Sequence, residues 1–349
     1  MNSTTVAVDL AKNVFEIAIA GADWRITDRH RLKRTKFARF FVQRTPCHVV
    51  MEACGSAHYW GRRIAALGHE VRLLPAQYVK KYVKRNKTDR ADAAALMEAA
   101  RCPDMKAVPI KTVEQQQVQS LHRLRTQWMC TRHRYINMLR GTLREFGVFI
   151  PLGINSAKAQ IGLALAEPGN GVPDGLRPLL TAMLGEIRAL EEKILAVERE
   201  LALLARADER VQRLCAIPGI GLLTSTALRA TVGDIHRFPS GRHFSSWLGI
   251  TASERSSAER RRLGKISKQG DTYLRTLRVH GARSALLAAH RVQRYGHSLT
   301  RLQQWALDCE QRCGHNKATL ALANRLARIV WATWKYDRTF DPNWSRQRA

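Results

Sequence analysis

The chain has 349 residues, and its 58 Lys and Arg outnumber its 29 Asp and Glu two to one, which gives a formal net charge of +29. A hydrophobic content of 45% is enough to build a core in each of two or three domains, so global disorder is excluded. The positive charge is spread along the chain, and this pattern favours nucleic acid over an anionic membrane surface as the partner.

The N-terminal segment argues against export. Asp9, Lys12 and Glu16 interrupt its apolar stretch, so it does not have the pattern of a signal peptide. No window offers the roughly 20 uninterrupted apolar residues of a membrane span, and we expect a cytoplasmic protein without a membrane partner. The seven cysteines are scattered, which is typical of reduced thiols. The sequence Cys309-x3-Cys313-x-His315 has metal-ligand spacing but lacks a fourth ligand nearby, and we do not expect zinc there.

Residues 4–109 alternate between two patterns. Short β-branched runs occupy residues 5–8, 15–19, 49–51 and 71–74, and helical stretches lie near residues 35–44, 56–67 and 91–101. This alternation indicates an α/β domain. Only residues 9–14 separate the first two runs, which suggests a hairpin and therefore a mixed sheet.

A long helical segment follows at residues 113–146 and completes a predicted domain over residues 1–150. It is rich in arginine and poor in acid. Its basic residues could be a solvated helix face, but the shortage of acid favours contact with nucleic acid. The contacts we expect are Arg123, Arg125 and Arg132.

Residues 151–207 are predicted to form a linker and a coiled coil. Several Gly and Pro residues in 151–175 are typical of a linker in part. Apolar residues then recur at strict 3-4 spacing, at Leu180, Met183, Ile187, Leu190, Ile194, Val197, Leu201 and Leu204. A helix packed inside its own domain would show the same seam, but the charged residues on its other faces favour an exposed rod that needs a partner. We therefore expect a homo-oligomer, a dimer at least and a tetramer in a synaptic complex.

The third predicted domain covers residues 208–349. It opens with the turn at residues 214–221, which is followed by a helical stretch at residues 222–232 and resembles a helix-hairpin-helix. In that motif, backbone N–H groups at Gly219 and Gly221 would meet a phosphate. A Pro-Gly turn between two packed helices is an equally good interpretation.

Four acidic residues are notable because acid is scarce in this chain. Asp9 and Glu52 each end a predicted strand, and Asp89 and Asp92 lie three apart at the start of a predicted helix, so the pair faces one way. Each could be a helix cap or the partner of an arginine. Together, clustered carboxylates repel one another unless a cation neutralises them, and hard oxygen ligands suit Mg²⁺ or Mn²⁺. The set predicts a metal site of the two-metal phosphoryl-transfer kind.

Residues 251–270 form a segment rich in Ser and Arg. Taken alone, such a segment is more often a phosphate-binding surface than a catalytic one. The basic side chains that we expect to contact nucleic acid here are Arg260, Arg261, Lys265 and Lys268.

Six motifs in order resemble the transposases of insertion-sequence family 110, particularly its 1111 branch, and related motifs occur in the Piv DNA invertases. The motifs are VAVDLAKNVFEIA, MEACGSAHYWGRRI, YVKRNKTDRADA, CAIPGIG, FSSWLGIT and GKISKQGDTYLR. The resemblance spans most of the chain. It implies a RuvC-like, ribonuclease-H-type domain with a DEDD metal site, a coiled coil, and a mainly helical C-terminal transposase domain with a nucleophilic serine.

Motif positions imply which residues carry these roles. The DEDD set corresponds to Asp9, Glu52, Asp89 and Asp92. Counting forward from the family's Gly-x-Thr, here residues 249–251, implies Ser257 as the nucleophile, and counting back from residues 266–268 leaves Ser256 as a rival. The family's usual Ser-Gly is Ser257-Ala258 here, a departure that affects the backbone freedom of the loop.

The resemblance also implies a mechanism. Members of this family are recombinases guided by a structured noncoding (bridge) RNA, whose loops pair with donor and target DNA. The serine forms a covalent phosphoserine intermediate, and the metal site of another subunit completes the active centre. A bacterial, nucleoid-associated protein is expected. Three alternatives remain: a Piv-type invertase, a RuvC-like junction endonuclease that uses water, and a catalytically silent nucleic-acid-binding module.

Overall fold

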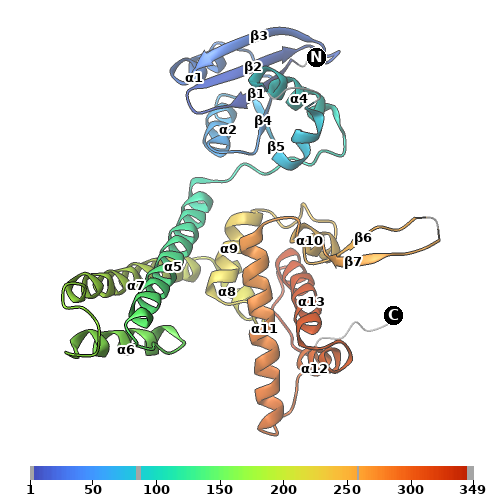
Figure 1. Cartoon of the computed structure of the whole chain (residues 1–349). Coiled ribbons are helices and arrows are strands. Elements are labelled where there is room, and N and C mark those ends of the chain that lie inside the picture. The colour runs from blue at the N-terminus through green and yellow to red at the C-terminus, as the bar shows by residue number, and fades with distance from the viewer. Residues whose placement is uncertain (1–3, 84–87, 258, 344–349) are drawn as a thin grey trace. The chain divides into compact units, whose positions relative to one another are not determined.

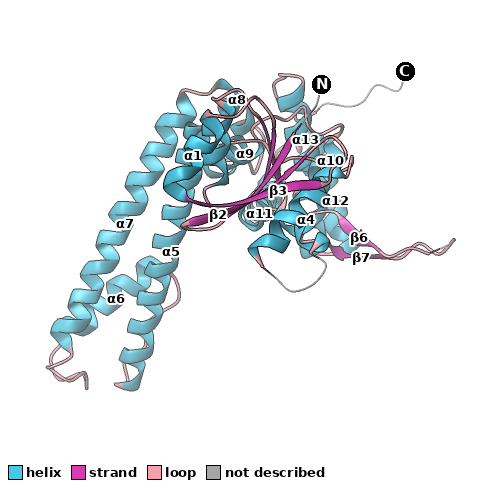
Figure 2. Ribbon diagram, turned by 90° about the horizontal axis from the view of Figure 1, so that it is seen from above, coloured by secondary structure: helices cyan, strands magenta, loops and turns pink. Residues whose placement is uncertain are grey.

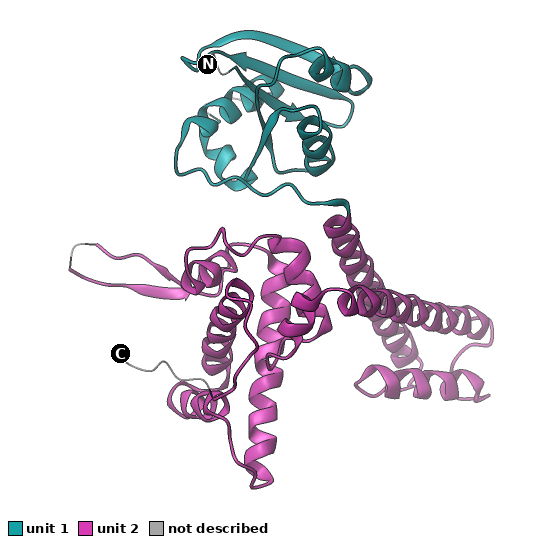
Figure 3. Cartoon of the chain, turned by 180° about the vertical axis from the view of Figure 1, so that it is seen from behind, with its two compact units in different colours: residues 1–113 teal, residues 114–349 magenta. Residues whose placement is uncertain are grey.

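The computed structural model describes residues 4–83, 88–257 and 259–343. The chain divides into two compact units, residues 1–113 and 114–349 (Figure 3). The unit boundary places the long helix that begins at Val113 in the second unit, whereas we had assigned it to the first domain. In the described part of the chain, no helix is both long enough and apolar enough to cross a membrane.

The first unit is built on a five-stranded mixed sheet of order β3-β2-β1-β4-β5 (Figure 1). The strands are β1 (Thr5–Leu10), β2 (Val14–Ala20), β3 (Ile26–Lys33), β4 (His48–Glu52) and β5 (Glu70–Leu74). Strand β1 pairs antiparallel with β2 and parallel with β4, which confirms the predicted hairpin and mixed sheet. Strand β3 was not predicted, because its sequence ITDRHRLK is largely polar and lies at the edge of the sheet.

Helices cover both faces of this sheet. Phe15, Val49 and other apolar side chains on one face pack with α1 (Arg34–Val42) and α2 (Ala57–Ala65). Small residues on the other face, such as Ala7, Ala18 and Val50, pack against α4 (Asp89–Arg101). The short helices α3 (Ala76–Val79) and η1 (Lys80–Tyr82) connect β5 toward α4. The four-residue and three-residue lengths of these two helices leave α4 as the main cover of that face.

The second unit begins with three helices, α5 (Val113–Glu145), α6 (Ile154–Ala166) and α7 (Arg177–Arg206). Helix α6 occupies part of the stretch that the sequence predicts to be a linker in part. Figure 2 shows α5 and α7 side by side, and ion pairs join Arg125 to Glu198 and Arg132 to Glu191. Because residue numbers rise on one helix as they fall on the other, the two helices run antiparallel.

The apolar seam of α7 is buried within this chain. Leu180, Leu184 and Ile187 pack with Ile136 and Leu139 of α5 and with Ile161 of α6. Further along, Leu190, Ile194, Val197 and Leu201 are buried as well. The prediction of an exposed rod whose seam needs a partner is therefore wrong, because helices of the same chain cover the seam.

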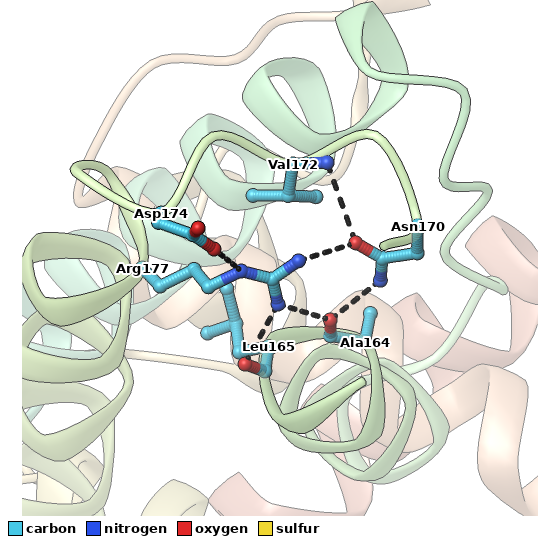
Figure 4. Close-up of polar contacts among 6 residues, drawn as sticks. All are labelled: Ala164, Leu165, Asn170, Val172, Asp174 and Arg177. Atoms are coloured by element: carbon cyan, nitrogen blue, oxygen red, sulfur yellow. Dashed lines mark hydrogen bonds and ion pairs between the residues drawn. The ribbon is translucent and has the colours of Figure 1, made fainter. Parts of the chain in front are cut away.

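A polar clip fixes the α6–α7 connection (Figure 4). The Arg177 guanidinium donates to the Ala164 and Leu165 carbonyls at the C-terminal end of α6, at 3.3 and 3.0 Å, and to Asn170 Oδ1 at 2.7 Å. Asn170 in turn donates to the Ala164 carbonyl. Arg177 and Asn170 thus satisfy carbonyls at the end of α6, and Arg177 links that end to the start of α7.

Six helices form the remainder of the second unit around one core. They are α8 (Glu209–Cys215), α9 (Leu222–Val232), α10 (Gly241–Trp247), α11 (Thr272–Arg294), α12 (Arg301–Cys313) and α13 (His315–Lys335). The mainly helical C-terminal region is confirmed. Between α10 and α11, strands β6 (Ala252–Glu254) and β7 (Leu263–Ile266) form a hairpin that extends away from the helices (Figure 1).

Candidate active site

Asp9 and Glu52 lie side by side on the sheet of the first unit. The register pairs Val8 of β1 with Met51 of β4, and each carboxylate follows directly after one of these residues. Because Ala7 and Val50, two residues earlier, pack on the α4 face, strand alternation directs both carboxylates toward that same face. Both residues are half-buried. The parallel pairing therefore makes these two acids neighbours.

Asp89 and Asp92 occupy the first turn of α4, the helix that covers this face. Thr88 caps the helix by accepting a hydrogen bond from the Ala91 N–H at 3.2 Å. The buried residue Ala93, which packs on the sheet, lies four positions after Asp89 and one after Asp92. The two aspartates therefore border the face of the helix that packs on the sheet. Acidic side chains in a first turn also interact favourably with the helix dipole.

The two pairs of acids do not close into a single cluster. In the parts of the chain that the structure describes, no group of three or more His, Cys, Asp or Glu side chains is placed to hold a metal ion. What the fold supplies is one carboxylate pair on the sheet and a second pair on the covering helix. These are hard oxygen donors, which fit a divalent cation such as Mg²⁺ or Mn²⁺.

Cys54 reports the negative charge of this region, and no pattern in the sequence marks this residue. Burial, and then the carboxylates of Glu52 and Asp9, raise the pKa of its thiol to about 11. A thiol that both carboxylates influence must lie close to both of them. The carboxylate part of this shift reflects negative charge where β1 and β4 end.

Ser257 lies at the turn of the β6–β7 hairpin. The Arg260 N–H donates to the Ser257 carbonyl at 3.1 Å, and the Ser257 N–H donates to the Arg260 carbonyl at 3.4 Å. The side chain of Ser257 is exposed. Ala258, the departure from the family's Ser-Gly, lies outside the described residues.

Ser256, the rival nucleophile, is held by its neighbours. Its hydroxyl donates to Glu254 Oε1 at 2.7 Å and accepts from the Arg262 N–H at 3.1 Å. Arg261 Nε donates to the same carboxylate oxygen at 3.2 Å. The hydrogen bond from Ser256, together with the Arg261 charge, lowers the pKa of Glu254. The hydroxyl of Ser256 is thus committed to the hairpin's own hydrogen bonds.

Two glycines clamp the base of the hairpin to the helices. Gly249 has φ of +70°, and a Cβ placed there would lie 1.8 Å from the Gln269 carbonyl oxygen. Gly270 has φ of +89°, and its Cβ would lie 2.1 Å from the Trp247 carbonyl oxygen. The Lys268 N–H also donates to the Gly249 carbonyl at 3.1 Å. Only glycine fits at either position, so the hairpin leaves the helices in a fixed direction.

The hairpin carries a dense group of exposed cations. These are Arg255, Arg260, Arg261, Arg262, Lys265 and Lys268. Within residues 252–268, the acids are Glu254 and Glu259. An exposed two-stranded ribbon with this excess of positive charge can bind a phosphodiester backbone.

The arginines of α5 differ in their surroundings. Arg125 Nε donates to Glu198 Oε1 at 2.7 Å, Arg132 Nη1 lies 3.5 Å from Glu191 Oε1, and both arginine side chains are about 15% exposed. Arg123 is exposed. The expectation that all three contact nucleic acid is revised, because Arg125 and Arg132 bind α7.

The turn between α8 and α9 is packed against another helix. Gly219 has φ of +76°, and a Cβ there would lie 2.3 Å from the Gly281 carbonyl oxygen of α11. This glycine therefore serves close packing, as the alternative interpretation of the turn held. Gly221 is exposed at the start of α9, so it is the one of the two glycines placed to meet a phosphate.

Glu310 contacts the histidine of the Cys309-x3-Cys313-x-His315 pattern near the C-terminus. Cys309 Sγ lies 3.7 Å from Cys313 Sγ. His315, however, hydrogen-bonds Glu310 at 2.7 Å, and Glu310 also contacts His290 at 2.5 Å. The imidazole is thus turned toward a carboxylate of α12.

Comparisons with known proteins match both units. A transposase family model named for the DEDD transposases of IS110 matches residues 6–148, and the model of the transposase IS116/IS110/IS902 family matches residues 211–297. The first match ends at residue 148, just past the end of α5, so it extends into the second unit and includes that helix.

Whole proteins are similar over nearly their full length. A probable family 20 transposase of Pseudomonas aeruginosa is 40% identical over 98% of this chain and 100% of its own length. The transposase for insertion sequence element IS1111A of Coxiella burnetii is 36% identical over 96% of this chain and 90% of its own. The transposase for IS1328 of Yersinia enterocolitica is 36% identical over 95% and 96%.

Proposed function

Because the chain belongs to the IS116/IS110/IS902 family of insertion-sequence transposases, we propose that it cleaves and rejoins DNA through two centres, one acidic and one on the hairpin. The acidic centre comprises Asp9, Glu52, Asp89 and Asp92. The nucleophile is Ser257. The observation that carries this proposal is the adjacency of Asp9 and Glu52 on β1 and β4, within the region that matches the DEDD transposases.

The acidic centre is proposed to work with a divalent cation, Mg²⁺ or Mn²⁺. A bound cation of this kind supplies Lewis acidity and charge stabilisation at a phosphodiester. Asp9 and Glu52 would hold it from the sheet, with Asp89 and Asp92 facing them from α4. The RuvC-like, ribonuclease-H-type character of this domain belongs to the same proposal, supported by the mixed sheet with its antiparallel β1–β2 hairpin and parallel β4.

Ser257 is proposed to attack the DNA phosphate. Its hydroxyl gives up its proton as the oxygen bonds to phosphorus, and a deoxyribose oxygen leaves and takes up a proton. Reversal of this step by the hydroxyl of another strand rejoins the DNA without an external energy source. One observation favours Ser257 over Ser256: both serines are exposed, but the Ser256 hydroxyl is engaged by Glu254 and Arg262.

Guidance by a noncoding RNA and action as a homo-oligomer complete the proposal. The net charge of +29 and the exposed cations of the hairpin suit backbone contacts to both RNA and DNA. Since the seam of α7 is covered within the chain, subunits would associate through other surfaces. A long hairpin that presents a serine away from its own helices suits delivery to a partner's acidic centre.

The acidic centre is tested by strand cleavage. Labelled donor and target DNA are incubated with Mg²⁺, protein and RNA transcribed from the element's ends, and wild type is compared with Asp9→Asn. Asp28→Asn is the matched control, because Asp28 pairs with Ile19 on the opposite face of the same sheet. Loss of cleavage in Asp9→Asn alone supports the proposal, and cleavage that survives in Asp9→Asn contradicts it.

The products separate the remaining alternatives. Cleavage without a protein–DNA adduct favours a junction endonuclease that uses water. Binding with steep salt dependence but without cleavage favours a silent binding module. Inversion between flanking inverted sites, with no RNA required, favours an invertase of the Piv type.

A further inference from the structure

Arg29 connects the edge of the sheet to the first turn of α4. It lies on β3 opposite Ala18, and Ala18 belongs to the face that α4 covers. Its guanidinium Nη1 donates to the Arg90 carbonyl at 3.3 Å. Arg90 is the residue that follows Asp89 and precedes Asp92 by two, so the contact is made within the turn that carries both aspartates.

The N-terminal end of α4 is an unfavourable position for the positive charge of Arg29. The first turn of a helix favours anions, and the neighbouring Arg90 repels a second guanidinium. Burial, and then the Arg90 charge, lower the pKa of Arg29, whereas Glu16 raises it. Glu16 lies on β2 directly opposite Asp9, on the same face. Arg29 thus lies between the sheet acids Glu16 and Asp9 and the first turn of α4. Burial and the Arg90 charge both disfavour its positive charge there.

The contact has a geometric consequence for the acids. The sheet positions Asp9 and Glu52 through its register, but α4 follows a segment that lies outside the described residues. Within α4, Ala93, Leu96 and Met97 hold the helix body to the sheet, and they all come after the aspartates. The Thr88 cap orders the turn internally without fixing it to a strand. The hydrogen bond from Arg29 supplies that attachment.

We propose that Arg29 is a positioning residue of the acidic centre, which holds the first turn of α4 to the sheet so that a cation can draw Asp89 and Asp92 together with Asp9 and Glu52. This inference rests on the proposed function, since it assumes that the four carboxylates form one divalent-cation site. Arg29 would not touch the cation or the DNA. It would lower the free energy needed to bring the two carboxylate pairs together, as outer partners of metal ligands do.

Arg31 provides a matched control. It lies two residues along β3 from Arg29, opposite Glu16 and on the same face of the sheet, and it is exposed. Removing either arginine takes one positive charge from the same edge. Among the described residues, only Arg29 of the two has a hydrogen bond to α4.

The test measures Mn²⁺ binding to the full-length protein by the spin-resonance signal of free Mn²⁺, with wild type, Arg29→Gln and Arg31→Gln. We expect Arg29→Gln to weaken binding roughly tenfold, the lower end of the effect of outer partners of metal ligands, and Arg31→Gln to change it less than twofold. Amide hydrogen exchange of residues 91–94 is expected to become faster in Arg29→Gln, with residues 97–101 unchanged.

Each outcome has one meaning. Equal Mn²⁺ affinity of Arg29→Gln and wild type overturns the positioning role, as does equal weakening by Arg29→Gln and Arg31→Gln, which would show a general charge effect. Faster exchange throughout α4 would also overturn it, because the helix as a whole would then have loosened. If Asp9→Asn binds Mn²⁺ as wild type does, the acidic centre itself fails, independently of Arg29.

Discussion

The acidic face of the sheet and the β6–β7 hairpin hold the side chains of the two proposed centres in opposite ways. Asp9 and Glu52 are placed by the register of a buried sheet, and any slip of one residue would send both to the other face. Ser257 lies on an exposed ribbon whose position depends on two glycines at its base. One proposed centre is thus built into a core, whereas the other is presented on an exposed hairpin and can reach a site elsewhere.

The largest expected effect concerns whether the helix acids join the sheet acids. Asp89→Asn and Asp92→Asn are each expected to lower strand cleavage by about a hundredfold or more, since a lost carboxylate ligand weakens the divalent site. Glu98→Gln, on the same helix, is the control and should leave cleavage unchanged. Single-turnover cleavage at a Mg²⁺ concentration that does not saturate wild type measures this. Normal rates in both aspartate variants would confine the site to the sheet.

The close packing at the base of the hairpin is expected to contribute to the free energy of unfolding. Gly249→Ala places a methyl group against the Gln269 carbonyl at a left-handed backbone position, and we expect it to cost about 3 kcal/mol or more of unfolding free energy. Gly296→Ala is the control, because Gly296 has φ of +70° but no atom within 4 Å of its Cβ, so it should cost only about 1 kcal/mol. Urea unfolding compares them. Equal costs would show that the close approach at the base does not matter.

The junction between α5 and the helical core should respond to pH. His122 hydrogen-bonds Tyr273 Oη at 2.9 Å and Thr226 Oγ1 at 3.0 Å. Burial, and then Arg125, lower its pKa from 6.5 to about 4. The neutral ring thus stabilises the fold fully above pH 6.5, and this contribution is lost as the pH falls toward 4, to a total of about 3 kcal/mol.

His122→Gln isolates this effect. Subtracting the unfolding free energies of the variant from those of wild type at each pH removes the contributions of the other histidines. The difference should be largest above pH 6.5 and should shrink as the pH falls toward 4. A difference that stays constant over this range would contradict the buried, neutral state of His122.

The smallest expected effect separates structural from binding arginines on α5. Arg125→Gln breaks a largely buried ion pair with Glu198 and should lower unfolding free energy by about 1 to 2 kcal/mol. Arg123→Gln, at an exposed position, should leave stability unchanged and weaken binding of RNA or DNA at low salt. Thermal unfolding and salt-dependent binding assays measure the two. A stability loss in Arg123→Gln would contradict this division.

The sequence predicts those elements whose local pattern agrees with their tertiary surroundings. Strands β1, β2, β4 and β5 have apolar, β-branched runs, and α5 and α9 have clear helical patterns, so all six appear close to the predicted residues. The four acids are candidates from the sequence because acid is scarce and each lies at the end or start of an element, and their joint role stays a prediction.

Features that depend on distant partners could not be predicted. The α7 seam has the same spacing whether its partner is another chain or α5 and α6. Strand β3 is polar because it is an edge strand, and the Ser/Arg segment looks like a loop because its ribbon is solvated on both sides. The Gly219–Gly281 approach and the Arg29–Arg90 hydrogen bond join residues about 60 positions apart, and no local pattern marks such pairs.

The most direct test of the account is a search for a covalent protein–DNA adduct. Labelled DNA, guide RNA and Mg²⁺ are incubated with wild type, Ser257→Ala or Ser256→Ala, and the products are separated on a denaturing gel. The account predicts a labelled band at protein mass for wild type and Ser256→Ala, and none for Ser257→Ala. An adduct that persists in Ser257→Ala, or cleavage without any adduct in wild type, would contradict it.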